Sequence, residues 1–301
     1  MPTTTPPRPY LHLLMVISAT LVSTSFTVGE AIAADLDPAV LTLLRFLLAS
    51  ILLAPVISLK HSLKPNWSLI GRSAIISCCL VLFFWCMFLA LRYTTALNTS
   101  VIFTLVPSIS GLFATFLVRE RLGRPQLFAL ALGLIGALWV IFRGDIELLL
   151  AMAWNRGDLI FLLGCLSMAL YTPLVKLLYR GESMLLMTFW VLVTGSVWLL
   201  LFGADKLLVV EWAAVRPMVW WALLYLAVFT TVITFFLTQY CTPHIGATRA
   251  MAYSYLYPGL VLLIDLALGK GLPPLRTLPG IGIVLLAMVV LQYTSSRLEK
   301  Q

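Results

Sequence analysis

The chain has 301 residues, of which 61% are hydrophobic and only 11% are charged. Soluble domains average about 45–50% apolar and about 25% charged residues, so this composition excludes an ordinary soluble globule. The net charge of +8 does not indicate nucleic-acid binding, because Lys and Arg stand between apolar runs, where they set topology and contact lipid headgroups. We expect a polytopic membrane protein embedded in the lipid bilayer.

Ten apolar segments follow one another along the chain, each close to the ~20 residues that a helix needs to cross a bilayer. Short polar stretches separate them: residues 35–38 follow the first segment and residues 60–66 the second. The loops are short throughout, so we expect the function to lie within the bilayer. The expected spans are 12–33, 39–59, 69–91, 96–118, 125–142, 157–179, 184–202, 218–239, 247–268 and 276–293.

The distribution of Lys and Arg predicts the orientation of these spans. If the N-terminus is cytoplasmic, the inner segments hold more of these residues than the outer segments, mainly in the first half of the chain. Cytoplasmic loops carry such an excess. We therefore expect an integral protein of a bacterial cytoplasmic (inner) membrane, with both termini on the cytoplasmic side.

Two stretches in opposite halves of the chain share one pattern. FTLVPSISGLFATFLVRERL (103–122) and YSYLYPGLVLLIDLALGKGL (253–272) each carry a proline inside an apolar helix, then a short charged turn before a Gly-rich last helix. Pro107 and Pro258 lie 151 residues apart, which is half the chain. This pattern predicts two copies of a five-helix unit, residues 1–148 and 149–301. Because five is odd, the second copy is inverted, which is a usual construction of secondary transporters. The predicted fold is all-α, with ten transmembrane helices as two inverted five-helix repeats.

The paired prolines have two possible roles. Each removes one backbone donor, so Pro107 frees the carbonyl of Phe103 and Pro258 frees that of Ser254. Unpaired backbone groups at membrane depth are tolerated only against protein or a wet cavity. Prolines in membrane helices also serve simply to bend them. The matched positions in a repeat favour a cavity or hinge role.

Residues 90–142 carry a family resemblance. The segment ALRYTTALNTSVIFTLVPSISGLFATFLVRERLGRPQLFALALGLIGALWVIF has an Ala-Leu-x-Tyr opening, a mid-helix proline, a Glu-Arg-Leu turn and a Gly-rich final helix. It resembles the signature half of the EamA family in the drug/metabolite transporter superfamily. The second copy departs from that pattern, since Gly269-Lys270-Gly271 replaces the Glu-bearing turn, and the family's first-helix tryptophan is absent around residues 23–26. The resemblance implies a carrier with a central cavity lined by helices one, three and four of each repeat, and relatives that move amino acids, drugs or other small metabolites.

Glu30 and Asp265 are carboxylates within apolar spans, where ionisable groups are costly and often functional. Glu30 lies near the outer end of the first span, as a candidate for taking up a proton or meeting a substrate amine. The alternative is an ion pair with Arg45, at similar depth on the second span. Asp265 follows Pro258 by seven residues and shares its helix face; a position at headgroup level is the alternative. Glu30 and Asp265 are the proton-coupling candidates, and Gln239 is a weaker polar candidate.

Aromatic residues indicate the character of the expected cavity. Tyr253 and Tyr257 form an i,i+4 pair beside Pro258, and four further aromatics fall on helices that the resemblance places around the cavity. An aromatic wall with few fixed charges suits apolar or aromatic amino acids, or lipophilic cations; simple packing is the alternative for each ring. The substrate-cavity candidates are Phe26, Glu30, Trp85, Phe103, Pro107, Tyr171, Gln239, Tyr253, Tyr257 and Pro258.

Motifs for other functions are absent from the sequence. It has no GxxxxGK[ST] loop for nucleotide phosphates and no HExxH helix; its three histidines lack the partner spacing of a catalytic site. We therefore expect the chain to have no catalytic residue, cofactor or metal, and we expect that it is not an enzyme. A channel is the other rival, but no filter-like loop occurs. We expect a secondary transporter of a small-molecule substrate, most simply an exporter of apolar or aromatic amino acids; an exporter of lipophilic drugs or cations is the alternative, and an intramembrane enzyme comes last.

Ala129, Gly133 and Ala137 recur every four residues in the fifth span. Such a stripe of small residues lets two helices approach closely. We expect it to serve packing within the chain rather than dimerisation, and the sequence leaves the oligomeric state open.

Overall fold

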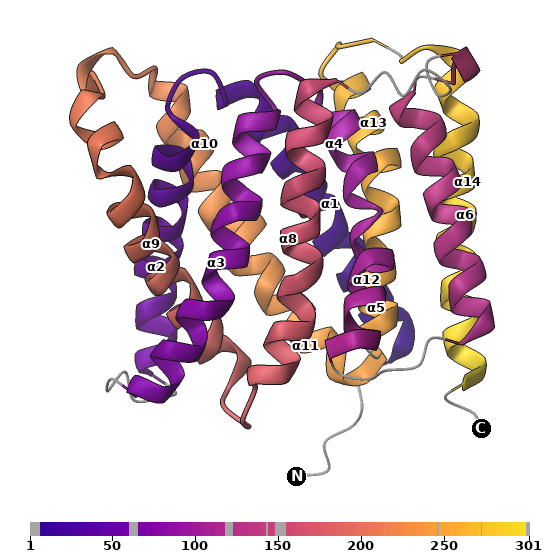
Figure 1. The fold of residues 1–301 in the computed structure, drawn as a ribbon, viewed down its shortest axis with the longest axis horizontal. Coiled ribbons are helices and arrows are strands. Elements are labelled where there is room, and N and C mark those ends of the chain that lie inside the picture. Colours follow the sequence, from indigo (N-terminus) through magenta and orange to yellow (C-terminus); the bar gives the residue numbers. More distant parts are fainter. Residues whose placement is uncertain are drawn as a thin grey trace.

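In the computed structural model, the described part of the chain is helical and its helices stand side by side (Figure 1). The structure describes residues 7–59, 66–117, 123–142, 144–147, 155–245, 247–271 and 273–298. The helices are α1 (Arg8–Ile32), α2 (Pro38–Ser58), α3 (Trp67–Ala90), α4 (Ala96–Phe103), α5 (Val106–Leu117), α6 (Arg124–Ile141), α8 (Arg156–Leu178), α9 (Met184–Val209), α10 (Pro217–Ala227), α11 (Thr234–Ile245), α12 (Ala247–Ala252), α13 (Tyr257–Ala267) and α14 (Leu278–Leu298). Four shorter helical turns join them: η1 (Trp212–Ala214), η2 (Val228–Ile233), η3 (Tyr253–Leu256) and η4 (Leu275–Thr277).

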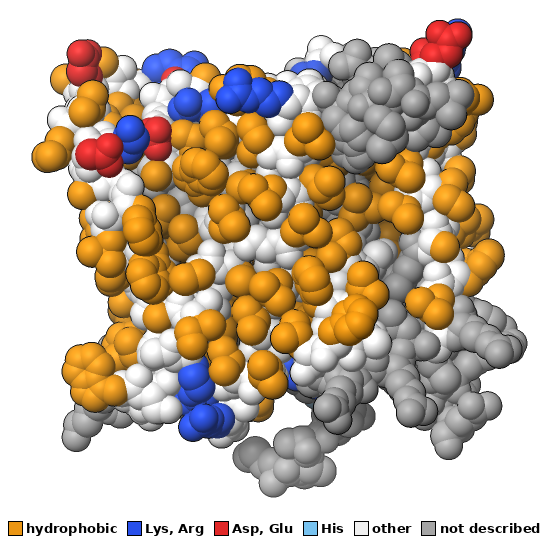
Figure 2. Space-filling view, in the orientation of Figure 1, with side chains coloured by type: hydrophobic (Ala, Val, Ile, Leu, Met, Phe, Trp, Pro, Cys, Tyr) orange, Lys and Arg blue, Asp and Glu red, His pale blue; other side chains and the backbone are white. Residues whose placement is uncertain are grey.

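The described residues include eight helical segments that are long and apolar enough to cross a membrane. Two shorter apolar helices, Leu127–Ile141 and Leu275–Val290, fall in the fifth and tenth expected spans. In Figure 2 hydrophobic side chains cover the flank of the molecule; Lys and Arg gather at both of its ends, and the visible Asp and Glu lie toward the upper end. The chain is therefore an integral, polytopic membrane protein, as its composition predicts.

Helix starts follow local sequence signals. Asp37 caps α2, its carboxylate accepting the Ala39 N–H at 2.9 Å, and Pro38 occupies the first helical position. Asn155 caps α8 in the same way through the Gly157 N–H at 2.8 Å. Such caps satisfy backbone donors that a helix leaves unpaired at its start, and proline costs nothing there. The charged turn at residues 118–122 lies outside the described residues.

The two expected prolines coincide with interruptions of their helices. Before Pro107, α4 gives way to a tight turn in which Thr104 N–H donates to Val101 O at 2.9 Å. Before Pro258, the 3₁₀ turn η3 separates α12 from α13. The expectation of a free Ser254 carbonyl is wrong, because this turn brings the Tyr257 N–H into hydrogen-bond contact with it. Tighter turns of this kind repair the bond that a proline removes.

Helices α6 and α14 pack against each other at one edge of the molecule (Figure 1). Their closest approach is at Gly136 and Gly280: a Cβ added at Gly136 would lie 2.8 Å from the Gly280 carbonyl oxygen. On the stripe of small residues, Ala129 and Ala137 are fully buried, and Gly133 contacts the Tyr255 ring. The stripe thus serves packing within the chain.

The ends of the bundle are distinct. Helix α1 begins and α14 ends at the same end, which we call the terminal end (Figure 1). The loops that join α1 to α2 and α13 to α14 lie at the opposite end. The longer helices run between these two ends, and α4 and α12 are interrupted partway between them.

Candidate functional site

A central cavity of about 190 Å³ lies among the helices. Its described lining comes from α1, α3 and α4 of the first half and from α8, α11, α12, η3 and α13 of the second, together with single residues of α2 and η2. Helices α6 and α14 contribute no described lining residue. Residues more than 200 positions apart, such as Ser18 and Thr238 with hydroxyls 3.4 Å apart, meet across it. The cavity is therefore formed jointly by both halves of the chain.

One wall of the cavity carries a buried guanidinium. Arg45 of α2 is 2% exposed, and its Nη2 and Nε donate to the hydroxyls of Thr230 at 2.9 Å and Thr231 at 3.2 Å. Its guanidinium carbon also lies 4.3 Å from the centre of the Phe84 ring. Arginine is costly inside a membrane protein, and such residues usually face an interior pathway.

The π-helix η2 explains how two consecutive threonines meet one guanidinium. In an α-helix neighbouring residues point about 100° apart, whereas a wider π turn changes that spacing and is frequent at functional sites. Both hydroxyls donate their protons to the same Leu226 carbonyl, at 2.9 and 3.0 Å. Their lone pairs are therefore left for Arg45. Neither the π turn nor this pairing was predicted; the Thr230-Thr231 pair within an apolar span was the only sequence signal.

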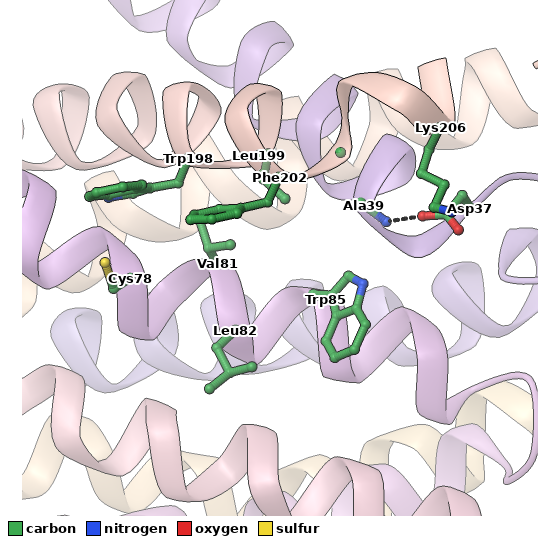
Figure 3. Close-up of a pocket in the computed structure, with 11 residues that line it drawn as sticks. Asp37, Ala39, Cys78, Val81, Leu82, Trp85, Trp198, Leu199, Phe202 and Lys206 are labelled. Carbon is green, nitrogen blue, oxygen red and sulfur yellow. Dashed lines mark hydrogen bonds between the residues drawn. The ribbon is translucent and has the colours of Figure 1, made fainter. Parts of the chain in front are cut away.

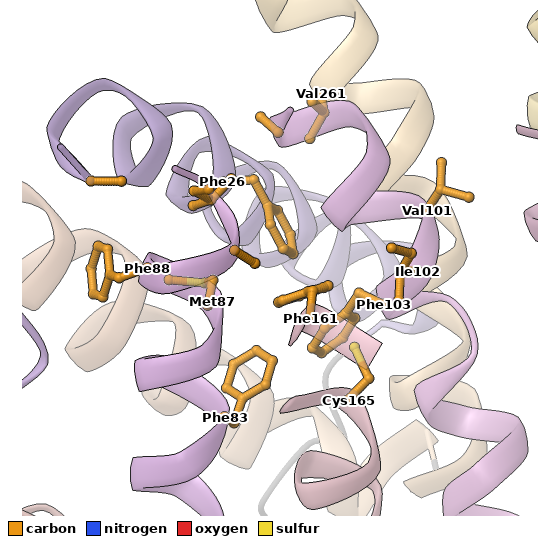
Figure 4. Packing of buried hydrophobic residues seen from close by; sticks show 14 of the residues in the cluster. Phe26, Phe83, Met87, Phe88, Val101, Ile102, Phe103, Phe161, Cys165 and Val261 are labelled. Atoms are coloured by element: carbon orange, nitrogen blue, oxygen red, sulfur yellow. The ribbon is translucent and has the colours of Figure 1, made fainter. Parts of the chain in front are cut away.

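Aromatic rings close the cavity toward the end opposite the termini. The Phe26 ring lies 6.0 Å from Phe103 and 6.2 Å from Tyr257, and the latter two are 5.5 Å apart. Phe83 and Phe161 extend the cluster, with Phe83 5.6 Å from Phe103 (Figure 4). Three predicted cavity residues, Phe26, Phe103 and Tyr257, thus meet here and line the cavity.

Toward the terminal end the lining becomes more polar. Tyr253, another predicted cavity residue, lines the cavity, and its hydroxyl lies 2.5 Å from Nδ1 of His12 on α1. This contact joins the first helix of one half to the interrupted helix of the other. It stands on the opposite side of the cavity from the aromatic cluster, so the cavity is bounded at both ends by contacts between the halves.

Beyond the aromatic cluster lies a second pocket, of about 410 Å³, which holds both predicted proton-coupling residues. Lys270 pairs with Glu30 and lies 3.3 Å from the Asp265 carboxylate, which also accepts from the Thr27 hydroxyl at 3.2 Å. We call Glu30, Asp265 and Lys270 the ion cluster. Burial lowers the pKa of Lys270, but the hydrogen bond and charge of Glu30 and the nearby Asp265 outweigh it, so the pKa is raised.

The alternative of a Glu30–Arg45 ion pair is not what the structure shows. Glu30 pairs with Lys270 and accepts the Ala96 N–H at 3.2 Å, whereas Arg45 bonds to threonines. The aromatic cluster lies between the two, because Phe26 is one helical turn before Glu30. Lys270 connects the two halves at this end through its pair with Glu30.

The remaining predicted cavity residues lie elsewhere. Trp85 lines a lipid-side groove of about 620 Å³ between α3 and α9, with Trp198 and Phe202 across from it (Figure 3). Tyr171 packs in a hydrophobic cluster around α2 and α9 rather than among the described lining of the central cavity. Pro107 and Pro258 sit at the helix interruptions without lining the cavity. The Gln239 side chain lies outside the described residues.

Metal binding has no support in the described part of the chain. No group of three His, Cys, Asp or Glu side chains comes together there in an arrangement that could hold an ion. The polar groups of the central cavity are instead one guanidinium and several hydroxyls. This arrangement suits reversible binding of a small polar or amphipathic organic molecule.

A model of the EamA-like transporter family matches the chain twice, over residues 10–142 and 155–293. The chain belongs to the EamA-like transporter family. The "Uncharacterized transporter YyaM" of Bacillus subtilis is 26% identical over 68% of this chain and 66% of that protein. An "Uncharacterized transporter" of Archaeoglobus fulgidus is 27% identical over 82% of this chain and 85% of its own length.

A solved structure, described only as a crystal structure of a protein, has the same fold as this EamA-like chain. It superposes with a TM-score of 0.67 at 18% identity, covering 97% of this chain and all of the other. At that identity the likeness supports the fold and nothing finer. The family match and the curated relatives, rather than this structural likeness, identify the chain as a membrane transporter of the drug/metabolite transporter superfamily.

Proposed function

We propose that this EamA-like protein is a secondary transporter that exports apolar or aromatic amino acids by alternating access around the central cavity. The observation that carries the proposal is the cavity itself, walled by Phe26, Phe103 and Tyr257 and closed at one end by their rings. Aromatic walls bind apolar and aromatic side chains through their large, rigid surfaces. A cavity of about 190 Å³ suits a molecule of amino-acid size.

We further propose that the two halves, residues 1–148 and 149–301, are inverted five-helix repeats. The two segments matched by the family model support this division. Packing supports it as well, because the first helix of each half makes matching contacts with the other half. Helix α1 of the first half packs on α11 and α13 of the second, and α8 of the second half packs on α3 and α5 of the first. The pairs α2–α9, α6–α14 and α4–α13 join equivalent helices. A pseudo-two-fold axis in the membrane plane produces this pattern, and such symmetry lets the halves exchange conformations.

This proposal assigns a state to the structure. The aromatic and ion clusters close the end away from the termini, whereas the central cavity extends toward the terminal end. With both termini in the cytoplasm of a bacterial or related cell, this state has its outer side closed. Transport then requires the ion cluster to open while the His12–Tyr253 contact holds the terminal end together.

A lipophilic cation is the second candidate substrate, because aromatic faces also attract cations. An intramembrane enzyme is disfavoured, since the cavity lining holds hydroxyls and one guanidinium but no carboxylate or histidine among its described residues. The function proposed is therefore movement of the substrate without its conversion.

The test uses proteoliposomes that contain the purified full chain. Labelled amino acids, amines and dyes are each measured for movement, with and without a pH gradient, and the recovered compounds are analysed for chemical change. We expect apolar or aromatic amino acids to move unchanged. Conversion without movement would support an enzyme instead, and movement of dyes and amines alone would support the lipophilic-cation alternative.

A further inference from the structure

Among the described residues, the guanidinium of Arg45 has no acidic partner. Its contacts are the hydroxyls of Thr230 and Thr231 and the face of Phe84, all of which are neutral. Its Nη1 is buried and has no hydrogen-bond partner among the described residues. A buried donor of a charged group that loses its hydrogen bonds to water and gains no other acceptor costs free energy. A protein keeps such an atom unpaired mainly where a ligand completes the site.

The described lining of the central cavity contains no Asp or Glu. The nearest acidic groups along α1 and α13 are Glu30 and Asp265, and both are engaged by Lys270 beyond the aromatic cluster. No described acidic side chain of the lining therefore compensates the positive charge of Arg45. A second buried polar atom in the lining, Oγ of Ser254, also lacks a partner in the described part of the chain.

We propose that Arg45 is the anion-binding residue of the central cavity and that the transported substrate carries a carboxylate, which binds at Nη1. This inference rests on the proposed function and names its substrate class: apolar or aromatic carboxylates, including amino acids. Guanidinium groups recognise carboxylates through short, charge-assisted hydrogen bonds with defined geometry. The aromatic rings then receive the apolar part of the same molecule.

The geometry also discriminates between the two candidate substrate classes. A lipophilic cation in the cavity meets the uncompensated charge of Arg45, and like charges in a poorly solvated site repel strongly. A phosphate ester carries about two charges, whereas the described lining offers one guanidinium. A monocarboxylate matches that charge. The threonines hold the guanidinium in place while leaving its charge available.

The test compares three compounds that share a phenyl ring and a short chain: L-phenylalanine, 3-phenylpropionate and 2-phenylethylamine. Transport of each labelled compound into proteoliposomes is measured for the wild type and for R45Q, R45K and R216Q. The last is the matched control, because Arg216 is an exposed arginine paired with Asp35 outside the cavity. We expect the wild type to move the two carboxylates and not the amine.

Loss of a charged partner of a buried pair weakens binding by at least about 30-fold. R45Q should therefore raise the half-saturation concentration for both carboxylates by at least that factor, R45K should recover part of it, and R216Q should match the wild type. Wild-type selectivity is informative even if R45Q does not fold. Transport of the amine as fast as the acid, or full carboxylate transport by R45Q, would overturn the role of Arg45 while leaving transport intact. Movement of none of the three compounds or of the wider amino-acid panel would overturn the proposed function, and this inference with it.

Discussion

Replacing Lys270 with alanine tests whether the ion cluster holds the end opposite the termini closed. Lys270 is the single cation between Glu30 and Asp265 in this described cluster, and its side chain is 41% exposed. Partly exposed pairs contribute about 0.2–1 kcal/mol each, so we assign about 1 kcal/mol to the two pairs together. By the usual conversion, that is about a fivefold change in the ratio of open to closed molecules.

The assay measures access to the central cavity from the side on which Lys270 lies. Val22 of α1 lines the cavity on the far side of the aromatic cluster from Lys270. The V22C substitution is made in a background without the five native cysteines. The new thiol then reacts with an impermeant reagent, added from the Lys270 side, only when that end opens. K270A should speed this labelling about fivefold.

The matched control is K206A. Lys206 lies near the same end, on α9, and its amine is 3.3 Å from the Asp205 carboxylate of its own helix. K206A should leave the labelling rate unchanged. Equal rates in K270A and the parent protein would refute a gating role for the ion cluster. An equal increase in K206A would show that any loss of positive charge at this end has the same effect.

Three further predictions follow from the packing and loop contacts. G136V should destabilise the purified protein by about 1–3 kcal/mol because its side chain meets the facing backbone at 2.8 Å, whereas G282A, whose Cβ meets nothing within 4 Å, should leave the thermal midpoint unchanged. Glu182 is held by Arg72, which lowers the pKa of Glu182 from 4.5 to about 2. The stabilisation that this pair gives is therefore present above pH 4.5 and is lost as the pH falls toward 2. The stability deficit of E182Q relative to the wild type, measured by denaturation, should shrink over that pH range. Pro258→Ala should leave membrane insertion intact but change the transport rate in proteoliposomes, and unchanged kinetics would assign this proline to packing alone.

The parts of the structure that could be predicted are those encoded locally. Apolar length predicts the spans, and Asp37 before Pro38 predicts where a helix begins. Pro107 and Pro258 predict interruptions because each lacks a donor at its own position. The same local reasoning fails for the Ser254 carbonyl, because a change of helix type supplies it with the Tyr257 N–H.

Contacts between distant segments could not be predicted in this way. Glu30 pairs with Lys270, which is 240 residues away in the sequence, and the local sequence around either residue does not indicate its partner. Arg45 was matched to Glu30 by depth alone, but the aromatic rings around Phe26 stand between them. Helical spacing likewise places Trp85 on a face of α3 without saying whether that face meets the cavity or the lipid-side groove.

Crosslinking the closed end tests alternating access most directly. Thr27 and Asp265 lie on opposite halves, with their side-chain oxygens 3.2 Å apart, so T27C and D265C in the cysteine-free background can be joined by a disulfide or a short cleavable crosslinker. We expect amino-acid exchange in proteoliposomes to stop when the pair is joined and to return when the link is reduced, with each single-cysteine variant unaffected by the same treatment. Exchange at the full rate with the crosslink intact would contradict alternating access.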